Sequence, residues 1–149
     1  MTIKDLDVRV LEELIQNSNT PVRDIARKLG VSVGTVHAKI KAMERDGTIK
    51  GYAAVTDLSK VGYDITAVTE VIVSKGRLFE VEKEIAKMRN VVVVYDVTGM
   101  ADIITIGKFR SREELSSFTK KVLSLPYVER TNTSMALTIV KEDFRLMPH

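Results

Sequence analysis

Apolar residues recur at helical spacing over the first third of the chain. One stripe runs through Leu6, Val10 and Leu14, and a later stripe runs through Val36, Ile40 and Met43. A shorter stripe lies between them. Because spacings of three and four residues place side chains on one face of a helix, the pattern predicts three amphipathic helices, over residues 5–16, 22–29 and 33–46.

Residues with capping preferences mark the ends of these helices. Pro21 suits the first turn of the second helix, with Thr20 as its N-cap. Gly30 suits the position just after that helix, and Ser32 suits the N-cap of the third helix. A glycine then closes the third helix, and residues 48–52 predict a short wing or strand.

Beyond residue 62 the pattern changes to runs of β-branched residues separated by helical stripes. Such runs favour strands. The predicted order is strand, helix, strand, strand, helix, strand, over residues 65–73, 78–88, 91–97, 103–109, 112–125 and 128–140, with Ser111 as the N-cap of the second helix. Two strand–helix–strand units side by side predict a ferredoxin-like βαββαβ domain, and the whole chain is therefore predicted to be α+β.

The predicted sheet has helices on one face only. Its other face has no cover within the chain, and an apolar sheet face needs a partner. A second copy of the same chain is the simplest partner, because one symmetric contact covers both faces. We therefore expect a homodimer.

Composition narrows the class of protein. The chain has 149 residues, of which 44% are hydrophobic and 29% are charged, a balance typical of soluble globular proteins. No apolar run approaches the roughly 20 residues needed to span a bilayer, and the start of the chain has no signal-peptide pattern. We therefore expect a cytoplasmic protein without membrane contact. Because there is no cysteine and the only histidines are His37 and His149, we expect no metal site.

Basic residues are concentrated in one short segment. Residues 1–22 contain two basic and four acidic side chains, whereas residues 23–50 contain seven basic and three acidic ones. A local net charge of +4 beside one of −2 favours a phosphate-binding surface over a uniformly charged exterior. An ordinary solvated helix surface remains the alternative explanation.

Three short helices with a tight turn before the third are the layout of a helix-turn-helix, in which the third helix enters the major groove of DNA. The groove requires small or hydrogen-bonding side chains at the start of that helix, and basic ones near the phosphates. The candidate DNA-binding residues are Ser32, Gly34, Thr35, His37, Lys39, Lys41 and Arg45. A plain three-helix bundle with a charged surface is the alternative.

Taken together, these segments resemble the Lrp/AsnC family of transcription regulators over nearly the whole chain. The most specific matches are Leu29-Gly30-Val31-Ser32, Thr35-Val36, the turn from Gly47 to Gly51, Leu58 with Gly62, and Thr98-Gly99-Met100-Ala101-Asp102. One departure is Lys39, where the family often has arginine. Lysine cannot form a bidentate contact, which places base reading at that position in doubt.

The resemblance implies a winged helix-turn-helix domain, a linker strand and a C-terminal domain that dimerises through its sheet and often assembles further into octamers. Many members bind a free amino acid at the contacts between dimers. We therefore expect a helix-turn-helix domain at residues 1–50, a hinge at residues 51–62 and a dimerisation and effector domain at residues 63–149.

Matching the motif positions assigns effector binding to Gly99, Asp102, Thr131 and Thr133. A carboxylate can pair with an α-ammonium group, and backbone N–H groups near a glycine can hold an α-carboxylate. The two threonines are expected on one face, because strand side chains alternate. The alternative is a purely structural role, with a turn glycine, a turn-capping aspartate and two strand-forming threonines.

The sequence thus predicts a sequence-specific DNA-binding transcription regulator modulated by an amino acid. The competing hypothesis is an architectural protein that organises DNA with little sequence preference. An enzyme is not expected, because no nucleophile–base pair, phosphate-binding loop or metal cluster is recognisable.

Overall fold

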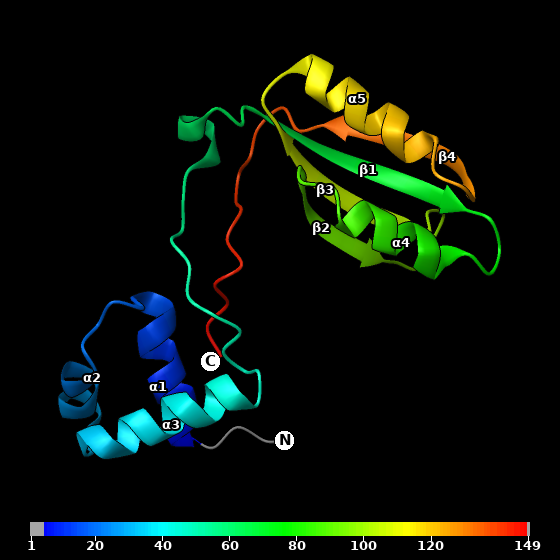
Figure 1. Cartoon of the computed structure of the whole chain (residues 1–149). Helices are drawn as coiled ribbons and strands as arrows, with labels where there is room; N and C mark the ends of the chain where they lie inside the picture. Colours follow the sequence, from blue (N-terminus) through cyan, green and yellow to red (C-terminus); the bar gives the residue numbers. More distant parts are fainter. Residues whose placement is uncertain (1–4, 149) are drawn as a thin grey trace. The chain divides into compact units, whose positions relative to one another are not determined.

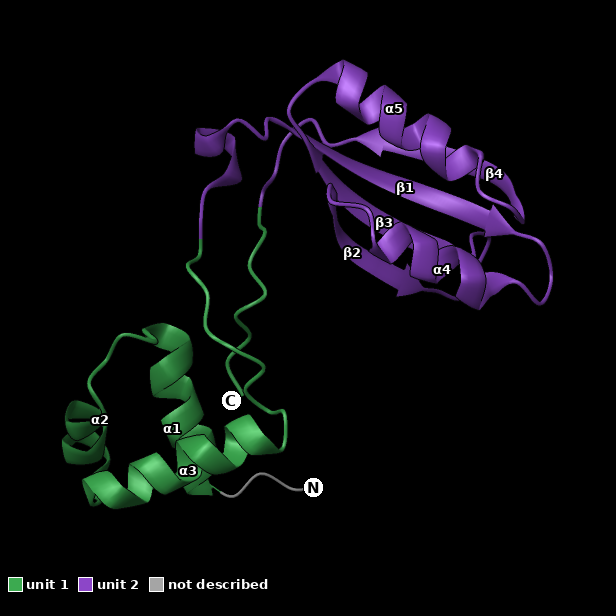
Figure 2. Cartoon of the chain, in the orientation of Figure 1, with its two compact units in different colours: residues 1–55, 141–149 green, residues 56–140 purple. Residues whose placement is uncertain are grey.

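The computed structural model describes residues 5–148, so that His149 lies outside the described part. Contacts divide the chain into two compact units, residues 1–55 with 141–149 and residues 56–140 (Figure 2). The C-terminal tail therefore groups with the N-terminal unit by its contacts, although the domain boundaries predicted from the sequence include it in the second domain.

The first unit contains three helices, α1 (Asp5–Gln16), α2 (Val22–Leu29) and α3 (Val33–Arg45). Their apolar stripes meet in one core, as the periodicity predicted. The buried members are Val10, Ile25, Ala26, Val36, Ile40 and Met43. Because burial of such side chains is the main favourable term in folding, this core fixes how α3 is held against α1 and α2.

Two of the predicted helix boundaries in this unit are confirmed and one is wrong. Gly30 ends α2 in the left-handed conformation, with φ of 69°, and Ser32 caps α3 with its hydroxyl. Thr20 does not cap α2. The N-cap position is instead taken by Pro21, whose extended backbone (ψ of 137°) leads into the helix without a side-chain hydrogen bond.

Residues 48–57 form no strand, although a short wing or strand was expected at residues 48–52. The segment begins as a turn, in which the Ile49 N–H donates a hydrogen bond to the Met43 carbonyl oxygen, with an N–O distance of 2.9 Å. It continues as extended chain to a short 3₁₀ helix, η1 (Leu58–Val61). Since a strand needs a hydrogen-bonded neighbour, the segment stays irregular within this chain.

The second unit is a four-stranded antiparallel sheet with two helices. Its elements are β1 (Ile65–Val73), α4 (Leu78–Ala86), β2 (Val91–Asp96), β3 (Ile103–Phe109), α5 (Arg112–Leu123) and β4 (Val128–Met135). The strand order is β2-β3-β1-β4. This arrangement confirms the predicted ferredoxin-like βαββαβ domain, and Ser111 is the N-cap of α5, as expected.

Both helices cover the same face of this sheet (Figure 1). The core between sheet and helices is formed by alternate strand residues and by the inner faces of α4 and α5. It includes Ala67, Val71, Ile103, Phe109, Val81, Ile85, Phe118 and Val122. The opposite face of the sheet, called the open face below, carries the intervening residues, among them Val68, Glu70, Ile72, Ile104 and Ile106.

The final strand is shorter than the sequence predicted. β4 ends at Met135 instead of Val140, because its neighbour β1 begins at Ile65. The Ala136 N–H still donates to the Thr66 carbonyl at 2.8 Å. Residues 137–140 continue past the end of β1 and lack a strand neighbour, despite their strand-forming sequence.

Candidate DNA-binding helix and effector region

The start of α3 is held by two hydroxyl groups. Ser32 Oγ accepts a hydrogen bond from the Thr35 backbone N–H at 3.1 Å and lies 2.8 Å from Thr35 Oγ1. This cap satisfies one of the free N–H groups of the first helical turn. The remaining free N–H groups and the helix dipole favour an anion at this end.

The solvent-exposed face of α3 combines small residues with polar and basic ones. Val36, Ile40 and Met43 face the core. The exposed residues are Val33, Gly34, His37, Ala38, Lys41, Ala42 and Arg45. Ala42 was not among the predicted contacts, although its lack of bulk on this face could have suggested it. Small residues allow the backbone of a recognition helix to approach a groove closely.

Gly34 has no structural requirement for glycine within this chain. It is the second residue of α3, and a Cβ added there would meet only Ser32 Oγ, at an ordinary 3.9 Å. Glycine in a helix costs about 0.5 to 1 kcal/mol relative to alanine. Packing inside the chain therefore does not account for this glycine.

Lys39 faces α1 and not the open solvent side of α3. Its Nζ lies 2.8 Å from Asp7 Oδ1, and the two side chains are only 27% and 20% exposed. A second ion pair, between Lys28 and Glu13 at 2.6 Å, joins α2 to α1 in the same way. The acidic face of α1 thus neutralises two of the basic residues counted in the sequence, and Lys39 helps to hold α3 in place.

Lys41 lies in a small exposed network at the C-terminal half of α3. Its Nζ donates to Glu44 at 3.0 Å, and the Tyr52 hydroxyl donates to the other oxygen of Glu44 at 3.0 Å. Hydrogen bonds from Lys41 and then from Tyr52 lower the pKa of Glu44. Burial, followed by the bond to Glu44, raises the pKa of Tyr52. An exposed pair of this kind is weak, so that Lys41 can exchange Glu44 for a phosphate.

Three cations of the basic segment at residues 23–50, namely Arg23, Arg45 and Lys50, have no ion-pair partner among the described residues. Of these three cations, only Arg45 is among the DNA contacts predicted from the sequence. The sequence could also have identified Arg23 as unpaired. Neither Arg23 nor Arg45 has an acidic residue three or four positions away, whereas Arg27 and Lys41 each form an ion pair with such a neighbour. Unpaired cations are the ones that neutralise phosphates without first breaking a bond.

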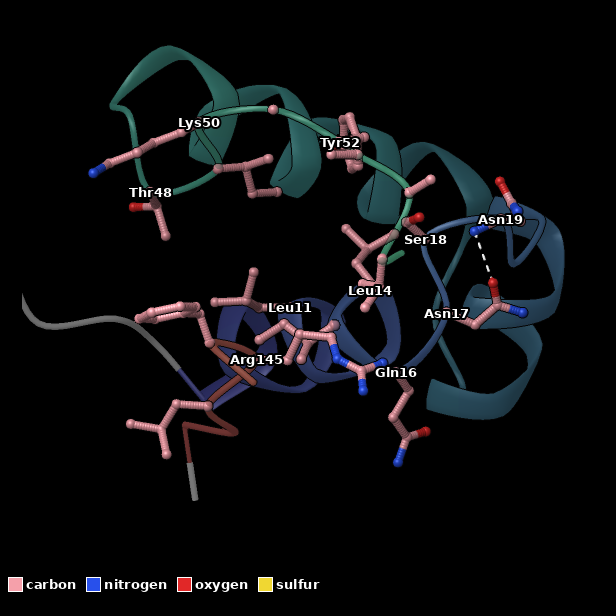
Figure 3. Close-up of a pocket in the computed structure, with 18 residues that line it drawn as sticks. Leu11, Leu14, Gln16, Asn17, Ser18, Asn19, Thr48, Lys50, Tyr52 and Arg145 are labelled. Atoms are coloured by element: carbon pink, nitrogen blue, oxygen red, sulfur yellow. Dashed lines mark hydrogen bonds between the residues drawn. The ribbon is translucent and has the colours of Figure 1, made fainter. Parts of the chain in front are cut away.

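A cavity of about 510 Å³ lies in the first unit, away from the exposed face of α3. Leu11 and Leu14 of α1 face the segment that carries Thr48 and Tyr52 across it (Figure 3). The turn after α1 forms one end, where the Asn19 N–H donates to Asn17 Oδ1 at 3.0 Å (Figure 3). Residues 144–146 of the tail complete the lining. None of the predicted site residues lines this cavity.

The predicted effector residues lie in the second unit and do not all meet at one place. Asp102 Oδ2 accepts a hydrogen bond from the Val73 N–H at 2.8 Å, which ties the turn before β3 to the end of β1. Gly99, in the same turn, has a φ of 121°, a conformation that favours glycine. In the free chain both residues therefore also shape the turn.

The two predicted threonines lie on the same face of β4. Thr131 pairs with Val71 and Thr133 pairs with Thr69, so that both belong to the helix-covered face. Thr133 Oγ1 lies 2.9 Å from Thr69 Oγ1. Thr131 alone of the four predicted residues lines a second cavity, of about 350 Å³, together with Glu70, Ile72, Met100, Ala101, Arg130 and Asn132.

Two further features are absent from residues 5–148, a metal-binding cluster and a membrane-spanning helix. These residues contain no group of three or more metal-ligating side chains. None of the helices in this part of the chain is long and apolar enough to cross a membrane.

Sequence profiles of two known domains match the chain. The winged helix-turn-helix DNA-binding domain matches residues 3–50, and the Lrp/AsnC ligand binding domain matches residues 66–146. An uncharacterised HTH-type transcriptional regulator of Pyrococcus furiosus is 48% identical, over 99% of this chain and 100% of that protein. The HTH-type transcriptional regulator FL11 of the same organism is 32% identical, over 97% and 95% of the two chains.

Solved structures share the fold over almost the whole chain. Escherichia coli AsnC has a TM-score of 0.89 at 23% identity and covers 98% of this chain and 100% of its own. A transcriptional regulator of Neisseria meningitidis in complex with L-Met has a TM-score of 0.88 at 22% identity, over 97% and 96% of the two chains. These likenesses show the shared fold, and the matched profiles together with the Pyrococcus furiosus relative identify the chain as an HTH-type transcriptional regulator of the Lrp/AsnC family, which is not a family of enzymes.

Proposed function

We propose that this regulator binds DNA with sequence specificity and that a free amino acid modulates the binding. The exposed face of α3 is the observation that supports sequence-specific DNA binding. Gly34 is a glycine that internal packing does not require, and Arg45 has no ion-pair partner in the described part of the chain. A face with small residues at the start and cations farther along suits base contacts flanked by phosphate contacts.

Two substitutions test this assignment of roles. Thr35→Ala removes a hydroxyl at the start of α3, and it should weaken binding to a specific site more than binding to random DNA. Lys41→Ala should weaken both about equally, because a phosphate contact carries no sequence information. Equal effects of the two substitutions on specific and random DNA would contradict the placement of α3 in the groove.

The amino-acid response is assigned to the C-terminal domain, at contacts between subunits. The N. meningitidis regulator was crystallised with L-Met, which supports an amino acid as the class of ligand for this fold. A screen of thermal stability against the twenty amino acids tests it. A ligand at 100 times its Kd should stabilise the protein by about 2.7 kcal/mol, whereas no shift with any of them would remove the effector from the proposal.

The proposed assembly is a homodimer formed through the open face of the sheet, with an octamer as a further level. Val68, Ile72, Ile104 and Ile106 are half-buried on this face and have no covering element in their own unit, which favours a second copy as the cover. Within this proposal residues 1–50 bind DNA, residues 51–62 act as the hinge and residues 63–149 assemble and sense the ligand. Sedimentation velocity tests the assembly.

An architectural protein with little sequence preference is the second candidate. The unpaired cations Arg23, Arg45 and Lys50 favour it as much as they favour specific binding, because phosphate contacts alone supply non-specific affinity. Only a comparison of specific and random DNA separates the two.

A further inference from the structure

One carboxylate connects the exposed face of α3 with the chain segment that follows the helix. Glu44 Oε2 accepts a hydrogen bond from Lys41 Nζ at 3.0 Å, and Glu44 Oε1 accepts one from the Tyr52 hydroxyl at 3.0 Å. Lys41 lies on the face of α3 that is proposed to meet DNA, whereas Tyr52 is the second residue of the proposed hinge at residues 51–62. Glu44 is therefore shared between a proposed DNA contact and the hinge.

Tyr52 is the last residue before a stretch of chain that lacks backbone hydrogen bonds. Ahead of it, the turn after α3 is held by the Ile49 N–H, which donates to the Met43 carbonyl oxygen at 2.9 Å. Among the described residues, the N–H groups of residues 53–56 donate no hydrogen bond. The bond from Tyr52 to Glu44 therefore holds the start of the hinge against α3.

The two donors share the negative charge of one carboxylate. Each hydrogen bond draws electron density from the carboxylate, so that one donor weakens the bond to the other. Both donors lower the pKa of Glu44, Lys41 more than Tyr52, as expected when both stabilise the charged form. The side chains of Lys41 and Glu44 are 71% and 32% exposed, which makes their ion pair easy to exchange. Loss of the bond from Tyr52 should therefore leave Lys41 more tightly held by Glu44.

We propose that Tyr52 is a positioning residue for DNA binding, which acts through Glu44 to make Lys41 available to a phosphate. While the Tyr52 hydroxyl donates to one carboxylate oxygen, Glu44 holds Lys41 loosely. Without this hydroxyl the carboxylate interacts more strongly with Lys41, and a phosphate must displace a stronger ion pair. The inference rests on the proposed phosphate contact of Lys41, and it adds two residues that act without touching DNA.

The same contact makes DNA affinity depend on the hinge. A change in the hinge that withdraws the Tyr52 hydroxyl from Glu44 has the same effect as removing the hydroxyl, and it lowers the affinity for DNA. The converse also holds, because coupling between two binding events is reciprocal. A phosphate that takes Lys41 from Glu44 strengthens the bond from Tyr52 and thereby orders the start of the hinge.

Double-mutant cycles on the full-length chain test this coupling. The variants are Tyr52→Phe, Glu44→Gln and Lys41→Met, singly and in the two pairs that contain Tyr52→Phe. Phenylalanine loses only the hydroxyl, and glutamine keeps an acceptor for Tyr52 but forms no ion pair with Lys41. Tyr63→Phe is the matched control, because the Tyr63 ring lies 4.6 Å from the Arg110 guanidinium carbon but its hydroxyl makes no hydrogen bond within the described residues. The measurement is fluorescence anisotropy of one labelled duplex of random sequence at fixed salt.

Tyr52→Phe should weaken DNA binding by about two- to fivefold, the range of one exposed ion pair, whereas Tyr63→Phe should leave it unchanged. Glu44→Gln should bind more tightly than the unmodified protein, because it releases Lys41 and removes a negative charge near the phosphates. Adding Tyr52→Phe to Glu44→Gln or to Lys41→Met should have no further effect. A general loss of structure would instead persist in both pairs.

Different failures have different meanings. Weakening by Tyr52→Phe that persists in Glu44→Gln would overturn the inference, because the Tyr52 hydroxyl would then act on DNA directly or on the fold. Unchanged binding by Tyr52→Phe alone, with weaker binding by Lys41→Met, would overturn it and leave the phosphate contact of Lys41 intact. Binding by Lys41→Met as tight as that of the unmodified protein would remove Lys41 from the proposed function, and this inference with it.

Discussion

Replacing Gly34 with alanine is expected to stabilise the protein and to weaken its binding to DNA. The added Cβ meets only Ser32 Oγ, at 3.9 Å, so that no clash offsets the gain in helix propensity. Alanine should therefore raise the free energy of unfolding by about 0.5 to 1 kcal/mol, part of which arises from a more restricted unfolded chain. Urea unfolding followed by circular dichroism measures this change.

The same methyl group would stand on the exposed face of α3, where a DNA backbone or base edge is proposed to approach. We expect specific binding to weaken by about 1 to 3 kcal/mol, the scale of one lost base contact, in fluorescence anisotropy at fixed salt. Ala42→Gly is the matched control on the same face, because it should lower stability by about 1 kcal/mol without adding bulk. Unchanged DNA affinity in Gly34→Ala would refute the close approach at this residue.

Three further predictions follow from individual contacts. Lys39→Met breaks the partly buried ion pair with Asp7 and should lower the free energy of unfolding by about 1 to 3 kcal/mol. It should leave the salt dependence of DNA binding unchanged. Lys41→Met, by contrast, should reduce the slope of log affinity against log salt concentration by about 1. Asp102→Ala removes the acceptor for the Val73 N–H and should cost about 1 to 3 kcal/mol in urea unfolding, while Asp102→Asn should retain most of the stability. Burial and then the charge of Asp96 raise the pKa of Glu82, and the folded state therefore binds its proton more tightly than the unfolded chain does. Glu82→Gln should raise stability at pH 7, and this gain should shrink as the pH falls through the raised folded pKa toward 4.5; a gain that is constant from pH 7 to pH 4 would contradict the assignment.

Local patterns predicted most of the fold because its helices are determined by nearby residues. Ser32 and Ser111 cap their helices through N–H groups only three residues away, and the apolar stripes define the helix faces. The cap at Thr20 failed for an equally local reason, since the extended backbone of Pro21 already starts α2. The predicted length of β4 was wrong for a different reason. A strand ends where its hydrogen-bonded neighbour ends, and the start of β1 lies some 70 positions earlier in the chain.

The site was less predictable, because side-chain partners come from distant parts of the chain. Helical spacing placed Lys39 on α3, but its proximity to Asp7 depends on how α1 packs against α3. Asp102 was assigned to a ligand from its motif, and its bond to the Val73 N–H became visible only with the strands in register.

The ratio of specific to random DNA affinity tests the central claim most directly. Binding sites selected from a random DNA library should be compared with unselected DNA by fluorescence anisotropy, at one salt concentration. A sequence-specific regulator should bind its best selected site at least about tenfold more tightly than random DNA. Equal affinity for selected and unselected DNA would contradict sequence-specific regulation and would favour the architectural alternative.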